Sequence, residues 1–269
     1  MPSFSTTTIL VAILFGVSAS AQSHTPSVRD GLRATAQTQS KQVAVSPEVD
    51  IRIAHPEYNA IGRVDALLPE GISHATGVLI SECLVLTNRH VIGEAGKDVT
   101  FRVGYTGDPS KPFAYIIKGT VVGTGGQGLQ EYEHGEDWAI IKLNQSIGKK
   151  RADGGVGSIP AVFADEAKVK SCPAPEIAGF PGDRTEEIMT HHQNCPFEGA
   201  AGGTFGFVCP VKHGESGSPV MCRFPDGSFK IISIVRTSET EGRTTGAVDF
   251  SYDREVIKKI AIKYRDTCP

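Results

Sequence analysis

A serine lies between two glycines in residues 212–220, a stretch whose composition suits a nucleophile on a tight turn. The stretch reads Lys-His-Gly-Glu-Ser-Gly-Ser-Pro-Val, and its central residue is Ser216. Because glycine has no Cβ, Gly214 and Gly217 let the backbone adopt conformations that other residues avoid. Backbone N–H groups can then converge on one point, where they would stabilise an oxyanion.

A serine hydroxyl needs a base to accept its proton, and the base needs a carboxylate to orient it. His90 lies in the run Leu-Thr-Asn-Arg-His-Val, and Asp137 begins the run Asp-Trp-Ala-Ile-Ile. Each of these residues taken alone is compatible with an ordinary turn or strand end. Together with Ser216, in the order His, Asp, Ser, they predict a catalytic triad.

From residue 50 onward, short apolar runs alternate with turn residues, a pattern typical of β proteins. The expected strands are 60–65, 75–80, 83–87, 99–103, 114–117 (continuing to 122), 138–143, 175–180, 187–190, 204–209, 219–223, 229–235 and 245–250. Only Ser81 and Glu82 separate the second and third of these, which predicts a hairpin. The polar stretch 144–158 is expected to be a linker, so the pattern indicates two small barrels or sandwiches. Apolar residues at helical spacing in 253–264, with Asp253 at the N-cap, predict one C-terminal helix.

The three segments together resemble the trypsin-like serine protease superfamily, and more closely its glutamyl endopeptidase branch. The similarity lies in Thr-Asn-x-His-Val around His90, Asp-Trp-Ala at Asp137 and Gly-x-Ser-Gly-Ser-Pro-Val around Ser216, and it extends over residues 60–265. The resemblance implies an all-β fold of two six-stranded antiparallel β-barrels with a C-terminal α-helix. The first barrel would occupy residues 49–150, and the second barrel with the helix would occupy 151–269.

The resemblance also implies a serine endopeptidase that works through an acyl-enzyme. Ser216 would attack the scissile carbonyl, His90 would transfer the proton, and Asp137 would orient the imidazole. The N–H groups of Gly214 and Ser216 would face the oxyanion. The expected partner of this monomer is a protein or peptide substrate, and the mechanism requires no metal or organic cofactor.

The residues expected near the substrate depart from the glutamyl endopeptidase pattern. Val235 stands where that branch has a glutamate-binding histidine, and Val211 stands where it has a threonine. A glutamate preference therefore cannot be transferred. Lys212, His213, Arg236 and Arg243 are cationic and near the pocket in sequence, and they could receive an acidic side chain or could be solvated charges at the rim.

Six cysteines in an exported chain predict three disulfides, and spacing alone leaves every pairing open. By resemblance to the trypsin-like fold, the hypothesis is Cys195–Cys209, Cys172–Cys222 and Cys83–Cys268.

Residues 1–21 read as a signal peptide, with an apolar core at 9–15 and Ala-Ser-Ala at 19–21. No Lys or Arg precedes the core, and a buried N-terminal strand is the alternative. Residues 22–48 are polar, as in a disordered linker or a pro-segment that ends between Ala44 and Arg52. A processing protease would then activate a zymogen that is secreted to the periplasm or the cell exterior.

Other functions fit the sequence less well. The net charge of −3 gives no drive toward nucleic acid or membrane. The pair His191-His192 is expected on a solvated face rather than at a metal, and residues 123–128 form a flexible loop rather than a phosphate loop. A catalytically silent, secreted trypsin-like binding protein is the alternative function. The order of the triad argues against an esterase of the α/β-hydrolase kind.

Overall fold

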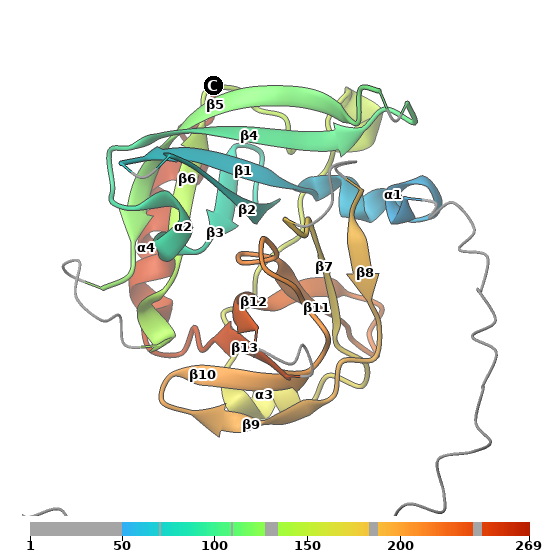
Figure 1. Ribbon diagram of the computed structural model, residues 1–269, viewed down its shortest axis with the longest axis vertical. Helices are drawn as coiled ribbons and strands as arrows, with labels where there is room; N and C mark the ends of the chain where they lie inside the picture. Colours follow the sequence, from blue (N-terminus) through green and yellow to red (C-terminus); the bar gives the residue numbers. More distant parts are fainter. Residues whose placement is uncertain (1–49, 70, 109, 127–133, 183–187, 239–243) are drawn as a thin grey trace, which may run out of the picture. The chain divides into compact units, whose positions relative to one another are not determined.

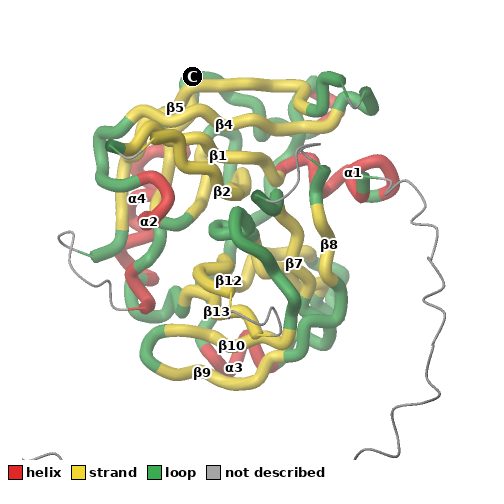
Figure 2. Tube along the Cα trace, in the orientation of Figure 1, coloured by secondary structure: helices red, strands yellow, loops and turns green. Residues whose placement is uncertain are grey.

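The structure is a computed structural model that describes residues 50–269, except residues 70 and 109 and the segments 127–133, 183–187 and 239–243. The expected signal peptide and the expected pro-segment, 1–21 and 22–48, lie outside the described residues. Strands predominate and helices are few, as Figures 1 and 2 show. Within the described part of the chain, no helix is both long and apolar enough to span a membrane.

Six strands close into the predicted first barrel, in the order β1-β2-β3-β6-β5-β4. Their bounds are β1 Ile61–Leu68, β2 Gly71–Leu79, β3 Leu84–Thr87, β4 Asp98–Tyr105, β5 Phe113–Thr124 and β6 Ala139–Leu143. The predicted hairpin is confirmed, because Val78 of β2 pairs with Leu86 of β3. Large apolar side chains such as Phe101 and Ile140 fill the interior and are fully buried. Burial of this apolar surface is what holds the barrel strands in register.

The second strand group is an open seven-stranded sheet, so the prediction of a second six-stranded barrel is wrong in this respect. Its order is β8-β7-β11-β12-β13-β10-β9. The bounds are β7 Glu176–Gly179, β8 Thr190–His192, β9 Phe197–Ala201, β10 Thr204–Val208, β11 Pro219–Arg223, β12 Phe229–Ser238 and β13 Thr244–Val248. Strand β8 begins where the expected strand 187–190 ends, and β9 was not expected.

The two edge strands, β8 and β9, are consecutive in sequence but do not pair. Between them Asn194 has a positive φ of 55°, and Pro196 has no N–H to donate. The Cys195 N–H donates to the Pro175 carbonyl, and the Pro196 carbonyl accepts from the Val208 N–H. These bonds turn the chain away from β8, so the sheet stays open.

Short helices connect the strands, and one longer helix ends the chain. They are α1 Ile51–Ala54, η1 Pro56–Ala60, α2 Arg89–Ile92, η2 His134–Glu136, η3 Arg151–Asp153, α3 Glu166–Lys170 and α4 Arg254–Arg265. The predicted helix α4 packs on the first barrel beside β5 and β6 (Figure 1), and its Ile257 is buried. Asp253 occupies the N-cap position, but its carboxylate accepts from the Trp138 indole N–H at 2.8 Å instead of capping the helix.

Disulfides join Cys83–Cys268, Cys172–Cys222 and Cys195–Cys209, and these are the pairs of the hypothesis. The first ties the residues just beyond α4 to the barrel, and the other two brace the seven-stranded sheet.

Removal of the Cys83–Cys268 disulfide by a double replacement with alanine is expected to lower the free energy of unfolding by about 2–4 kcal/mol. This bond spans 185 residues, whereas Cys195–Cys209 spans 14, so it restricts the unfolded chain more. Urea denaturation of the two double variants checks the order of the losses. A larger loss for the Cys195–Cys209 variant would contradict the expectation.

Candidate active site

The first barrel brings His90 and Asp137 together. Strands β3 and β6 pair, with Thr87 opposite Ala139, so the residues just outside these two positions meet at one end of the barrel. His90 lies in α2, directly after β3, and Asp137 directly precedes β6. The buried Asn88 side chain ties the two segments, because its Nδ2 donates to the Asp137 carbonyl at 2.8 Å.

The three predicted triad residues lie within hydrogen-bonding reach of one another. His90 Nδ1 is 2.7 Å from Asp137 Oδ2, and His90 Nε2 is 3.2 Å from Ser216 Oγ. The His90 backbone N–H also donates to Asp137 Oδ1, at 3.0 Å. With the ring proton on Nδ1, facing the carboxylate, Nε2 is free to accept the proton of the serine hydroxyl.

Asp137 is a buried carboxylate whose side chain is only 1% exposed. Burial alone would raise its pKa, but the hydrogen bonds and charge of His90 and the charge of Arg236 outweigh burial. The pKa of Asp137 therefore lies below its ordinary value. The Arg236 contact, with Nε 3.4 Å from Asp137 Oδ2, was not foreseen from the sequence.

On the acidic side of its pH profile, kcat/KM is expected to fall with the uptake of a single proton. A carboxyl group with a depressed pKa in the folded protein is ionised above about pH 4 and is protonated only as pH falls through that lower value. Asp137 therefore stays ionised above about pH 4 and adds no second protonation to the acidic side of the profile. Rates measured on a peptide substrate from pH 4 to 9 check this, and a two-proton dependence above about pH 4 would contradict it.

Glycines are required on both sides of Ser216. Gly214 has φ of 93° and Gly217 has φ of 81°, values that side chains with a Cβ rarely adopt. A Cβ on Gly214 would lie 2.3 Å from the Gly182 nitrogen, and one on Gly217 would lie 2.1 Å from the Thr76 carbonyl oxygen. The nucleophile loop is therefore pressed against both β2 and the segment after β7.

Backbone bonds aim the predicted oxyanion donors. The His213 carbonyl accepts from the Gly182 N–H at 2.8 Å. Since the C=O and N–H of a trans peptide point in opposite directions, the Gly214 N–H points away from Gly182. Among the described residues, neither the Gly214 N–H nor the Ser216 N–H has an acceptor. Both N–H groups are therefore available to an acceptor from outside the described residues, as the prediction of an oxyanion hole requires.

Thr76 of β2 fixes the nucleophile loop to the first barrel. Its N–H donates to the Ser216 carbonyl at 2.8 Å, and its hydroxyl accepts from the Phe180 N–H at 2.9 Å. The Thr87 hydroxyl in turn donates to the Thr76 carbonyl. One buried threonine thus links the strand that precedes His90, the nucleophile loop and the end of β7.

The residues predicted to contact the substrate lie in different environments. Val211 and Val235 are each 2% exposed and belong to the apolar core of the seven-stranded sheet. The His213 side chain is exposed, and Arg236 pairs with Asp137 while its carbonyl lies 3.4 Å from Ser216 Oγ. The two valines offer no polar group to a substrate, whereas Arg236 lies beside the reacting groups.

The prediction of a solvated His191-His192 pair is wrong. The side chain of His191 is 10% exposed and that of His192 is 17% exposed. Their Nε2 atoms lie 3.1 Å from Glu176 Oε2 and 3.2 Å from Glu215 Oε1, respectively. In the part of the chain that the structure describes, no cluster of three or more metal-ligating side chains occurs.

A sequence profile of the trypsin-like peptidase domain matches residues 75–227, which is more than half of the chain. The match begins within β2 and includes all three residues of the predicted triad. A search of curated protein sequences gave no significant match.

Solved structures of bacterial and other microbial proteases resemble the chain in fold. The thermostable serine protease AL20 from an extremophilic microorganism has a TM-score of 0.59 and 15% identity, over 74% of this chain and 95% of that one. The protease Anisep from Arthrobacter nicotinovorans has a TM-score of 0.53 and 18% identity, over 71% and 89%. The active form of a protease from M. tuberculosis has a TM-score of 0.51 and 18% identity, over 77% and 83%. At this level of identity the likeness shows a trypsin-like fold.

Proposed function

Because the chain belongs to the trypsin-like peptidase family, we propose that it is a serine endopeptidase that hydrolyses peptide bonds through an acyl-enzyme. The geometry of the triad carries the proposal: a buried aspartate bonds His90 Nδ1, and His90 Nε2 lies 3.2 Å from Ser216 Oγ. A silent binding protein would have no need of this arrangement beside two free backbone donors.

In the first half of the proposed reaction, Ser216 Oγ attacks the scissile carbonyl carbon while His90 Nε2 takes the hydroxyl proton. Asp137 holds the imidazole in the required tautomer and stabilises the imidazolium that forms. The tetrahedral intermediate collapses when His90 gives the proton to the leaving amine, which departs. In the second half, His90 removes a proton from water, the water attacks the acyl-enzyme, and the proton returns to Ser216 Oγ.

The N–H groups of Gly214 and Ser216 support the proposal because they are preorganised for the oxyanion. They need no reorganisation when negative charge develops, and each such donor is worth about 10²–10³ in rate. A water-exposed pair of donors on a mobile loop would contribute less, since its dipoles would have to be ordered during the reaction.

We further propose that the chain is exported and acts as a monomer outside the reducing cytoplasm. The disulfides and the apolar core at residues 9–15 support export. If a pro-segment is removed to activate a zymogen, the cut should precede Asp50, because Asp50 and Arg52 are both buried in the folded domain.

We propose that the chain is related to the glutamyl endopeptidase branch of the family but does not share the preference of that branch for glutamate. Val211 and Val235 are buried in the apolar core of the seven-stranded sheet and offer no polar group where that branch has polar groups. Arg236 is paired with Asp137, and the His213 side chain is exposed to solvent. An apolar or a small side chain at the cleaved position fits these residues better than a carboxylate.

Cleavage-site profiling tests the proposed function. The purified protein and its Ser216→Ala variant would be incubated with a proteome-derived peptide library, and new termini would be identified by mass spectrometry. The proposal expects cleavage by the wild type alone, without enrichment of Asp or Glu before the cut. No cleavage by a correctly folded wild type freed of residues 1–49 would favour the silent binding protein.

A further inference from the structure

Glu215, the residue directly before the nucleophile, carries a carboxylate that is completely buried. A buried carboxylate is costly unless donors compensate its lost hydration. The proposed reaction does not use this group, and the sequence offers no reason for an acid at this position. The groups around Glu215 must therefore compensate the carboxylate for the hydration it loses on burial.

Three donors face the Glu215 carboxylate. The backbone N–H of Lys212 donates to Oε2 at 2.6 Å. On the other oxygen, the Thr190 hydroxyl donates to Oε1 at 2.5 Å, and His192 Nε2 lies 3.2 Å from the same atom. Thr190 and His192 are the first and last residues of β8, so one short strand supplies both side-chain donors.

The Glu215 carboxylate closes the turn that presents the oxyanion donor. The Glu215 N–H donates to the Lys212 carbonyl while its side chain accepts from the Lys212 N–H. The peptide between His213 and Gly214 lies inside this turn. If the carboxylate lost its hold on Lys212, the bond from the Gly182 N–H to the His213 carbonyl would still hold one side of that peptide, but the turn around it would loosen and the Gly214 N–H would be held less firmly toward the oxyanion.

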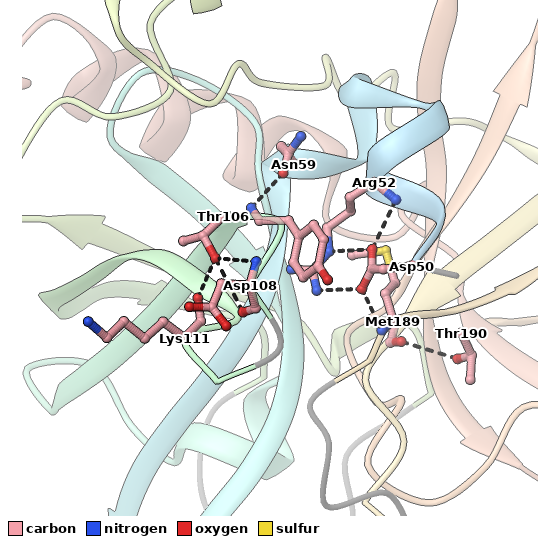
Figure 3. Close-up of polar contacts among 10 residues, drawn as sticks. Asp50, Arg52, Asn59, Thr106, Asp108, Lys111, Met189 and Thr190 are labelled. Carbon is pink, nitrogen blue, oxygen red and sulfur yellow. Dashed lines mark hydrogen bonds and ion pairs between the residues drawn. The ribbon is translucent and has the colours of Figure 1, made fainter. Parts of the chain in front are cut away.

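Strand β8 is itself held in place by the buried ion pair of Asp50 and Arg52, at the start of the described chain. Asp50 and Arg52 form two side-chain hydrogen bonds at 2.6 and 2.7 Å, and their side chains are 2% and 0% exposed. Asp50 Oδ2 also accepts from the N–H of Met189, the residue just before β8, at 3.3 Å. Figure 3 shows Asp50 between Arg52 and Met189, with Thr190 next along the strand.

Aromatic rings from both strand groups enclose the same ion pair. The Arg52 guanidinium lies 4.6 Å from the ring centroid of Tyr105, at the end of β4, and 5.2 Å from that of Phe180, after β7. Such contacts add cation–π attraction to the hydrogen bonds. The pair is therefore fixed against the barrel and against the sheet at once, and it gives Met189 a rigid acceptor.

We propose that Thr190 and His192 are positioning residues for the oxyanion loop through Glu215, and that the Asp50–Arg52 pair keeps β8 in the place where they can act. This inference rests on the proposed function and deepens it. In this arrangement the donors that fix the loop come from within the folded domain. Activity then requires residues 50–52 themselves, and it does not require a free amino group created by processing.

Thr190→Val and Thr190→Ser form a matched pair for the test. Valine has the shape of threonine without the hydroxyl, whereas serine keeps the hydroxyl. Thr190→Val is expected to lower kcat about 30-fold or more with KM changed by less than about threefold, because the lost interaction matters in the transition state. Thr190→Ser should stay within about threefold of the wild type in both constants. Equal kcat values for the two variants would overturn the proposal.

The ion pair is tested by Asp50→Asn, which keeps the shape of the side chain and removes its charge. Hydrogen–deuterium exchange of the segment 210–217 should become faster in Asp50→Asn and in Thr190→Val, but not in Thr190→Ser. Unchanged exchange in both of the first two variants would overturn the proposal. Hydrogen–deuterium exchange can be measured on an inactive protein. An inactive wild type would therefore contradict the proposed function, and the exchange rates would still test the positioning network separately.

The position of the amino terminus provides a third test, because the proposal expects activity not to depend on a free amino group at one particular residue. A chain that begins several residues before Asp50 and a chain that begins at Asp50 should differ in kcat by less than about threefold, since the network is complete in both. Beginning the chain at Ile53 should cost at least as much as Thr190→Val. Strong activity only in a chain with one particular amino terminus would contradict the proposal.

Discussion

Replacement of Ser216 by alanine is expected to lower kcat/KM on a peptide substrate by about 10⁶-fold. The triad acts as a unit, so removal of the nucleophile leaves only the rate that the oxyanion donors and substrate binding provide. The fold should survive, because among the described residues the Ser216 hydroxyl has only two hydrogen-bond partners, His90 Nε2 and the Arg236 carbonyl, both at 3.2 Å or more.

Ser218→Ala is the matched control for this measurement. Ser218 is two residues further along the same loop, it is buried, and within the described structure its hydroxyl has no hydrogen-bond partner. Its replacement should leave kcat/KM within about threefold of the wild type. An equal loss in both variants would indicate that the loop had been disturbed, and the role assigned to Ser216 would then be wrong.

Replacement of Asp137 by asparagine is expected to lower kcat by about 10⁴-fold. The amide group can donate to His90 Nδ1, which favours the tautomer with its proton on Nε2, and that tautomer cannot accept the proton of Ser216. The backbone contact from the His90 N–H to Oδ1 can persist, so the segment should keep its position. Stopped assays at pH 7 and a thermal unfolding curve for the same sample check activity and folding together.

Asp65→Asn distinguishes loss of a triad carboxylate from loss of another paired acid. Asp65 lies in the barrel, is partly buried, and accepts from Arg63 at 2.9 Å and from Arg102 at 2.6 Å. This variant should lose stability but keep kcat. A fall in kcat comparable to that of Asp137→Asn would contradict a specific role for Asp137.

The first barrel and the proximity of His90, Asp137 and Ser216 could be predicted because their signals are local in the sequence. The glycines beside Ser216 follow from backbone conformation at the turn itself, and the hairpin of β2 and β3 follows from two apolar runs with two residues between them. His90 and Asp137 needed one further step, the pairing of neighbouring strands, which the order of the motifs supplied.

Other features depend on contacts between residues far apart in sequence. The pairing of Arg236 with Asp137, and of His192 with Glu215, is decided by how β8 and β12 pack, and no spacing rule encodes it. Strand β9 reads Phe-Glu-Gly-Ala-Ala, which has no β-branched residue and only one large apolar side chain to mark it as a strand. The open edge of the sheet follows from the bonds around Cys195 and Pro196, which only the folded chain makes visible.

Covalent labelling by a fluorophosphonate tests the central claim most directly, because the reagent reacts with a serine only where a base and an oxyanion site activate it. The purified protein, its Ser216→Ala variant and its His90→Ala variant would be labelled, digested and mapped by mass spectrometry. We predict a single adduct on Ser216 in the wild type and none in either variant. Labelling of another residue, or no labelling of a folded wild type, would contradict the assignment of Ser216 as the nucleophile.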